Sequence, residues 1–242
     1  MELNILYLYP ELMSLYGDYA NLSVLSRHLE AMDVTVTIKK CTCEDIPDFT
    51  HADLIYMGAG TERSQKAALT YLLPHAEALK AAAEHGTLVL FTGNSMELLG
   101  TSITDINGTA WEGLAIGAFS TKETDKRTPE DVIAVSNLFD TPVVGFMNKC
   151  SVTCGVETPL FSSLTLGYGN ESAHGAEGFV NGNILATHIT GPVLVKNPAF
   201  TDLVIRRLFE IKNWVLPDAL PVLPHEHEAY EVTLQELNTR VK

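Results

Sequence analysis

The stretch TLVLFTGNSMELLG, residues 87–100, decides the fold. Its first five residues are Thr87 and an apolar, β-prone run, Leu88 to Phe91, which predicts a buried strand at residues 87–91. A short turn follows, and the chain then continues in a helical pattern. A buried strand that ends in a sharp turn and enters a helix is where many α/β enzymes carry their nucleophile. The segment therefore raises the question of which atom would attack a substrate.

Further apolar runs predict strands at residues 4–9, 34–38 and 54–57. Apolar residues at helical spacing lie between these runs. One such helix follows Asp18, for which we predict an N-cap role, and another surrounds Leu69. Strands that alternate with helices predict βαβ units, so we expect an α/β fold with a mostly parallel sheet flanked by helices.

The second half of the chain has a different pattern. Short β-rich pieces punctuated by Gly, Asn and Pro run over residues 113–183 and predict a more antiparallel region with loops. A strand at residues 183–190 and a helix at residues 200–211 follow. We expect one domain over residues 1–215 and a Pro-punctuated tail, residues 216–242, that packs on the domain or on a partner.

Composition excludes several classes of function. The formal net charge of −14 repels polyanions and argues against a nucleic-acid partner. No apolar run approaches the roughly 20 residues of a membrane span, and the start lacks a basic signal-peptide region, so we expect a cytoplasmic protein. The four cysteines are not spaced as in zinc or redox motifs, and the sequence predicts no metal and no other cofactor. These cysteines are Cys41, Cys43, Cys150 and Cys154.

Ligands of open α/β sheets bind outside the carboxyl ends of the strands. Three loops are predicted there: GAGTERSQ at residues 58–65, TGNSMELLG at residues 92–100 and THITGPVLVKN at residues 187–197. In the first loop, Gly58 and Gly60 are suited to present backbone N–H groups to a developing oxyanion. An ordinary Gly-rich turn explains the same spacing equally well.

These loops recur together with other segments in an order that resembles a known family. The chain resembles class I, CobB/CobQ-type glutamine amidotransferases, closest to the GatD family, the glutaminase subunit of lipid II isoglutaminyl synthase. The resemblance implies a flavodoxin-like fold and a role in peptidoglycan precursor amidation for the cell wall. It also implies a heterodimer with a Mur-ligase-like ATP-dependent subunit, and glutamine or a peptidoglycan precursor as ligand. The segments that carry it are LYGDYANLSVLSRHL, GAGTERSQ, ELLG, WEGLAIGAF, VVGFMNK, LGYGN and GPVLVKNP.

The family's two catalytic positions are vacant in this sequence. The family has a cysteine in a segment like CGGYQFLG and a histidine in LHGP, and these fall on Gly93 and Thr190. The cysteine thiolate attacks the glutamine amide to form a thioester, and the imidazole activates the thiol and protonates the departing ammonia. Glycine has no side chain, and a threonine hydroxyl does not take up a proton near neutral pH. We therefore expect a subunit that lacks glutaminase activity of its own.

Two alternatives stay open. Ser95 and His188 are candidate substitutes for the missing pair, because GNS echoes the G-x-S of serine hydrolases and strand alternation puts His188 on the face of Thr190. Against this, Glu97 stands where the second glycine of that motif belongs, and a serine near a helix start is usually a cap or contacts solvent. A small-molecule binding module that uses the vacated cleft is the other alternative. Cys150 and Cys154 are expected to be loop or partly buried thiols.

Other family positions are retained. Arg127 matches an arginine that the family resemblance implicates in holding the substrate, and a guanidinium suits a carboxylate; an exposed surface arginine is the alternative. Glu62, Arg63 and Gln65 follow the family's GSDREQ, with Glu62 in place of Asp and therefore with a longer reach. The resemblance thus places Gln65, with the two glycines of the same loop, near the substrate.

Overall fold

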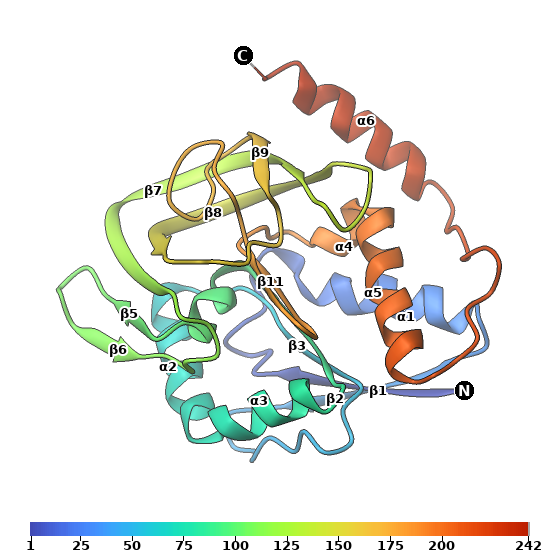
Figure 1. The fold of residues 1–242 in the computed structure, drawn as a ribbon, viewed down its shortest axis with the longest axis horizontal. Coiled ribbons are helices and arrows are strands. Elements are labelled where there is room, and N and C mark those ends of the chain that lie inside the picture. The colour runs from blue at the N-terminus through green and yellow to red at the C-terminus, as the bar shows by residue number, and fades with distance from the viewer. Residues whose placement is uncertain (242) are drawn as a thin grey trace.

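The main sheet lies at the centre of the computed structural model, which describes residues 1–241 (Figure 1). It has six strands in the order β10-β11-β4-β3-β1-β2, and only the β10/β11 pair is antiparallel. This confirms the predicted α/β fold with a mostly parallel sheet. The strands are β1 (Glu2–Leu8), β2 (Thr35–Cys41), β3 (Leu54–Met57), β4 (Leu88–Thr92), β10 (Phe179–Asn181) and β11 (Ile184–Thr187).

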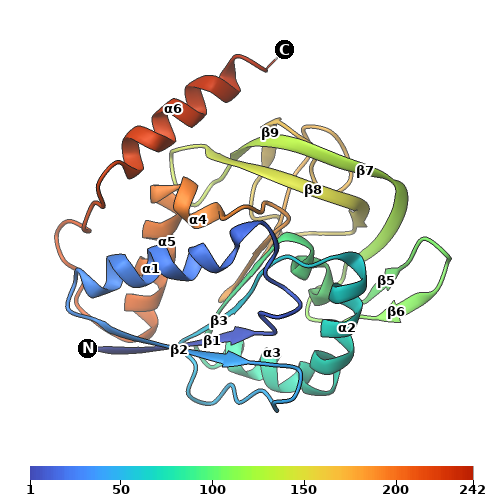
Figure 2. The ribbon, with the colours of Figure 1, turned by 180° about the vertical axis from the view of Figure 1, so that it is seen from behind.

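Helices cover both faces of this sheet (Figures 1 and 2). Alternate residues of β1 point to opposite faces: Ile5 packs with α1 and α5, whereas Leu6 packs with α2 and α3. The helices are α1 (Tyr19–Glu30), α2 (Glu62–Leu72), α3 (Ala76–Glu84), α4 (Val193–Lys196), α5 (Pro198–Ile211) and α6 (Glu226–Asn238), with 3-10 helices at Leu15–Gly17, Leu73–His75 and Gly93–Leu99.

A second, five-stranded sheet forms the β-rich half that the sequence predicts. Its long strands β7 and β8 pair in antiparallel register, and a register shift between Glu123 and Thr128 bends β7 (Figure 1). The backbone N–H of Thr190 donates to Phe146 O at 2.8 Å, which ties β8 to the end of the main sheet. The strands are β5 (Ser102–Thr104), β6 (Ala110–Glu112), β7 (Ser120–Val135), β8 (Val143–Cys154) and β9 (Ser163–Leu166).

Two local expectations, for Asp18 and Ser95, are wrong, and a third, the helix after the β4 corner, is found in a different form. Asp18 precedes α1 but makes no side-chain cap, because its buried carboxylate accepts hydrogen bonds from two other loops instead. The segment after the β4 corner is a 3-10 helix, Gly93–Leu99, almost wholly buried. Within it, Ser95 does not contact solvent: its hydroxyl is buried and donates to the carbonyls of Met57 and Thr92, because the short helix lies directly against β3.

The segment after Trp214 ends in α6. Tyr230 and Leu237 of this helix pack on Ile133 and Val144 of the second sheet. The Tyr230 hydroxyl also donates to the carbonyl of Pro142 at 2.8 Å. Among residues 1–241, no helix is both long enough and apolar enough to cross a bilayer.

Candidate functional site

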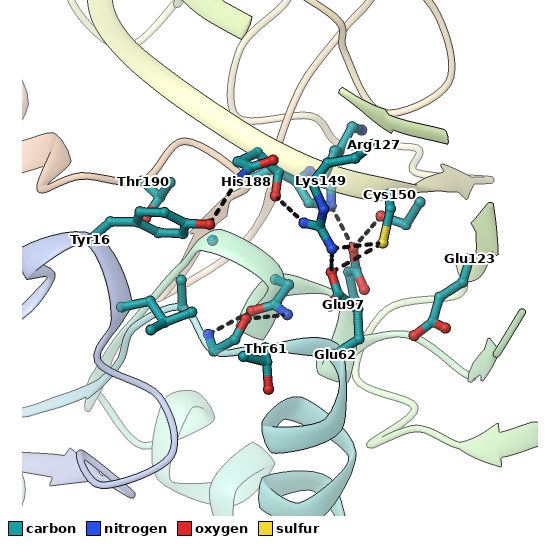
Figure 3. A pocket seen from close by; sticks show the side chains of 17 residues that line it. Tyr16, Thr61, Glu62, Glu97, Glu123, Arg127, Lys149, Cys150, His188 and Thr190 are labelled. Carbon is teal, nitrogen blue, oxygen red and sulfur yellow. Dashed lines mark hydrogen bonds and ion pairs between the residues drawn. The ribbon is translucent and has the colours of Figure 1, made fainter. Parts of the chain in front are cut away.

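A pocket of about 230 Å³ opens at the carboxyl ends of the main-sheet strands. Its floor comes from the loops after β3, β4 and β11, and its walls come from β7, β8 and the 3-10 helix Leu15–Gly17 (Figure 3). The position agrees with the rule for open α/β sheets. The bend in β7 and the tie between β8 and the main sheet therefore bring residues of both sheets into one site.

The two positions that the resemblance assigns to the catalytic pair, Gly93 and Thr190, both line this pocket. Gly93 forms the corner after β4 with a φ of +68°, a left-handed conformation that favours glycine, and it lines the pocket with Thr190. The Thr190 hydroxyl donates to Asp18 Oδ1 at 3.1 Å. The structure thus places an elbow where the sequence predicts one, and the elbow carries no nucleophilic atom.

Asp18 joins the loops that frame this corner. Its carboxylate accepts from the backbone N–H of Ala59 at 2.6 Å and from that of Gly191 at 3.3 Å, in addition to Thr190. Burial raises the pKa of Asp18, and these three donors partly offset the rise. The side chain therefore fixes the loops after β3 and β11 relative to each other.

His188 lies between two buried carboxylates. Its Nδ1 is 3.0 Å from Glu177 Oε1, and its Nε2 is 3.5 Å from Glu97 Oε1. Burial acts to raise the pKa of both glutamates, but the contacts with His188 and the other hydrogen-bond donors together outweigh it, so both pKa values are lowered. Ser151 and Gln65 also donate to Glu97. Both carboxylates are therefore ionised at neutral pH and hold the His188 ring in place.

The candidate dyad of Ser95 and His188 is not assembled. The Ser95 hydroxyl donates to main-chain carbonyls at 2.8 and 3.1 Å, and Ser95 does not line the pocket. The His188 ring lines the pocket but is engaged by Glu97 and Glu177. Among the side chains that the structure describes, no hydrogen bond joins Ser95 to His188, and this geometry argues against a relocated nucleophile and base.

Arg127 reaches into the pocket from the bent part of β7, where Figure 3 groups it with Glu62 and Cys150. Its Nη2 donates to Glu62 Oε1 at 2.6 Å, and its Nη1 donates to Asn148 O at 3.2 Å. The Arg127 side chain is 44% exposed. Arg127 is thus an exposed residue that pairs with Glu62, whose side chain is 32% exposed.

Cys150 is a partly buried thiol, one of the two alternatives that the sequence left open for it. It lies on β8 and lines the pocket, because β8 extends as far as Cys154. Its thiol donates to Glu62 Oε1 at 3.1 Å. Burial, followed by this hydrogen bond and the charge of Glu62, raises the pKa of Cys150 to about 12. The thiol therefore stays protonated at neutral pH, where a nucleophile needs a thiolate.

The remaining predicted site residues support the loops. The Gly60 N–H donates to Asn94 Oδ1 at 2.9 Å, so this donor is already engaged by the protein. The Gln65 Nε2 is behind the pocket wall, where it donates to Asn94 O and to Glu97 Oε2, each at 2.6 Å. Gly58 lies against Asp18 so closely that a Cβ there would be 2.8 Å from Asp18 Cβ. Of these three, only Gly60 lines the pocket.

Sequence reasoning did not identify several charged residues of the site, among them Glu97, Lys149 and Glu123. Glu97 has a local signal, since it is an acidic residue between Met96 and Leu98 in an apolar run. Lys149 is 5% exposed, donates to Gly169 O at 2.6 Å, and has a pKa that burial lowers. The role of Lys149, like those of Asp18 and Glu177, depends on hydrogen-bond partners that are far from it in the sequence.

Within residues 1–241, no group of three or more His, Cys, Asp or Glu side chains is placed to hold a metal ion.

Solved structures with the same fold include two glutamine amidotransferases. A crystal structure of a glutamine amidotransferase from Thermotoga maritima has a TM-score of 0.52 at 10% identity and covers 98% of this chain and 92% of its own. A second glutamine amidotransferase has a TM-score of 0.52 at 12% identity, with coverages of 86% and 98%. At these identities the likeness concerns the fold.

Sequence comparison is more specific. The GatD subunit of lipid II isoglutaminyl synthase (glutamine-hydrolyzing) from Staphylococcus aureus is 29% identical over 212 residues, which are 88% of this chain and 86% of the relative. The subunit of the same name from Streptococcus pneumoniae is 28% identical over 199 residues, or 81% and 76% of the two chains. The model of the CobB/CobQ-like glutamine amidotransferase domain matches residues 4–198. The chain therefore belongs to the CobB/CobQ-like glutamine amidotransferase family.

Proposed function

We propose that this protein is a glutamine amidotransferase-like subunit of a lipid II amidation complex and that it has no glutaminase activity of its own. Two relatives that span most of the chain are GatD subunits of lipid II isoglutaminyl synthase, which supports the assignment to this complex. In the proposal the subunit pairs with a Mur-ligase-like, ATP-dependent partner in the cytoplasm, and the pair amidates a peptidoglycan precursor.

The Gly93 corner carries this proposal. Hydrolysis of glutamine through a thioester needs a nucleophile that attacks the amide carbon and a base that takes the nucleophile's proton and delivers it to ammonia. The corner supplies no side-chain atom, and Thr190 supplies a hydroxyl that is hydrogen-bonded to Asp18. Cys150, the thiol that lines the pocket, has a pKa of about 12 and donates to Glu62.

The loops around the positions that lack a nucleophile and a base are well ordered by hydrogen bonds, which supports a structural role for the subunit in the complex. Buried and partly buried hydrogen bonds hold the loops after β3, β4 and β11 to one another through Asp18 and Asn94. A subunit with this frame is suited to hold and stabilise its ligase partner. The ligase then draws on free ammonia for amidation.

The test reconstitutes the subunit with its ligase partner and compares two nitrogen sources. With ATP and lipid II, the pair is expected to form the amidated product with an ammonium salt and to form none with glutamine in ammonia-free buffer. Adding an unrelated active glutaminase to the glutamine reaction is the control, since it must restore the product. Efficient amidation from glutamine alone would exclude the proposal.

A small-molecule binding module is the second candidate. Asn148 lines the pocket, and its buried side-chain oxygen has no hydrogen-bond partner within residues 1–241, so a ligand that donates there would satisfy it. A ligand selective for the native state raises the unfolding temperature. Thermal stabilisation by glutamine or a precursor fragment without any turnover supports this function, and no stabilisation by either argues against it.

A further inference from the structure

We propose that Ala59 closes the nucleophile position, so that an elbow nucleophile is excluded by a second residue as well as by the glycine at the corner. The Ala59 methyl occupies the space that the Cβ of any side chain at position 93 would need. The inference rests on the proposed function, because it concerns the same site. It adds that a substitution at position 93 alone does not make room there for a nucleophilic side chain.

The geometry at the corner is direct. An ideal Cβ built on Gly93 would lie 2.4 Å from Ala59 Cβ and 3.1 Å from Ala59 Cα. Non-bonded carbons approach to about 3.5–4.0 Å at the optimum. A methyl group has no rotamer by which it can move aside, so only a backbone shift would relieve this overlap.

The backbone around Ala59 is held from two sides. Its N–H donates to Asp18 Oδ2 at 2.6 Å, and its carbonyl accepts from the Leu15 N–H at 2.9 Å. Ala59 itself is only 3% exposed. A shift of this residue away from Gly93 would therefore strain or break these two hydrogen bonds, of which the bond to Asp18 is buried.

Asn94 fastens the two loops directly. Its Oδ1 accepts from the Gly60 N–H and its Nδ2 donates to the Gly60 carbonyl, each at 2.9 Å. Asn94, which follows Gly93, is thus hydrogen-bonded to both the backbone N–H and the backbone carbonyl of Gly60, which follows Ala59. The two loops cannot separate at the corner without losing this pair of hydrogen bonds.

The chain offers a control that separates crowding from backbone strain. Gly17 has a φ of +76°, close to the +68° of Gly93, and a Cβ at Gly17 would meet nothing within 4 Å. Gly17→Ala therefore measures the cost of a side chain at positive φ alone. Gly93→Ala bears the same strain together with the overlap with Ala59, so the difference between the two variants reports the overlap.

The experiment is a double-mutant cycle followed by thermal unfolding of the full chain. Overpacking costs about 1–3 kcal/mol, and 1 kcal/mol shifts Tm by about 2–4 °C at this size, so we expect Gly93→Ala to lower Tm by roughly 2–12 °C more than Gly17→Ala. Adding Ala59→Gly to Gly93→Ala is expected to recover at least half of that excess. If Gly93→Ala is insoluble, the recovery is read as soluble yield of the double variant.

Two results overturn the inference: equal Tm losses for Gly93→Ala and Gly17→Ala, or strictly additive effects of Ala59→Gly and Gly93→Ala. A third readout uses cysteine. Alkylation of position 93, followed by peptide mapping, is expected to be faster in Ala59→Gly/Gly93→Cys than in Gly93→Cys, and equal rates count against the inference. These readouts do not depend on turnover, so glutaminase activity of the wild type would remove the proposed function and leave the cycle interpretable.

Discussion

The Glu62 carboxylate accepts a 2.6 Å hydrogen bond from Arg127 Nη2 inside the pocket (Figure 3). The same Glu62 oxygen accepts from the Cys150 thiol at 3.1 Å. The side chain that the family resemblance assigns to the substrate is therefore paired within the protein. Glutamate has a longer side chain than the aspartate of the family's segment, which is consistent with this contact. The pairing of Glu62 with Arg127 and Cys150 has two measurable consequences.

The first consequence concerns ligand affinity. A ligand carboxylate that binds Arg127 must displace Glu62, so Glu62→Gln is expected to tighten binding of glutamine. Pairs this exposed contribute about 0–1 kcal/mol, which corresponds to an affinity gain of up to about fivefold. Calorimetric titration of wild type and variant measures it. Glu123→Gln is the control, because Glu123 lines the same pocket and pairs with Lys66 instead. Equal affinities of wild type and Glu62→Gln would contradict the prediction.

The second consequence concerns thiol reactivity. Glu62 contributes to the pKa of about 12 at Cys150, so Glu62→Gln is expected to lower that pKa and speed alkylation at mildly alkaline pH. Rates per cysteine come from mass spectrometry of labelled peptides. Cys43 is the internal control, since burial and Glu11 raise its pKa to about 12 and its rate should not change. An unchanged Cys150 rate would refute the role given to Glu62.

The buried carboxylates predict a loss of stability in acid. Glu97 and Glu177 have pKa values below the ordinary 4.5, because His188 and other donors stabilise their charged forms. A lowered pKa contributes stability above the unfolded-state value, and this contribution disappears as the pH falls through the folded-state value. Glu177→Gln removes one such group. The wild type should therefore lose more free energy of unfolding than this variant between about pH 5 and pH 3, as measured by urea titration. Parallel losses would contradict it.

Asn197 is predicted to be a large single contributor to stability. Its Oδ1 accepts from the Val144 N–H at 2.7 Å, and its Nδ2 donates to the carbonyls of Val144 and Val193 at 2.8 and 2.7 Å. Asn197→Ala removes these bonds and leaves buried backbone groups unpaired, at a cost of about 2–4 kcal/mol. Urea unfolding measures the loss, and exposed Asn107→Ala is the control. A loss below about 0.5 kcal/mol, typical of a surface site, would contradict the prediction.

Local patterns predicted the frame of this protein well. The strand at residues 54–57 was predicted with its observed bounds, because this short apolar run is flanked by Asp53 and Gly58, residues that are unfavourable in strands. The elbow after β4 was located from the same kind of run. The antiparallel half was predicted from its Gly-punctuated β segments, although the bend that brings Arg127 to the pocket has no such local signature.

The electrostatics of the site could not be predicted in the same way. Asp18 has the position of an N-cap residue in the sequence. Its hydrogen-bond partners Ala59 and Gly191 lie on two loops that are far from it in the sequence, so no local pattern reveals them. His188 is held by Glu97 and Glu177, which lie on different elements. The overlap between Ala59 and a side chain at position 93 likewise could not be predicted from the sequence, because it depends on the distance between the loops that follow β3 and β4.

The central claim is that the elbow has no nucleophile, and glutamate release from glutamine by the purified subunit with its ligase partner tests it most directly. The expected result is release at the rate of the buffer blank, unchanged in His188→Ala and Ser95→Ala variants. Partner-stimulated release well above the blank, abolished by either variant without loss of the fold, would contradict the claim and assign the activity to the relocated pair.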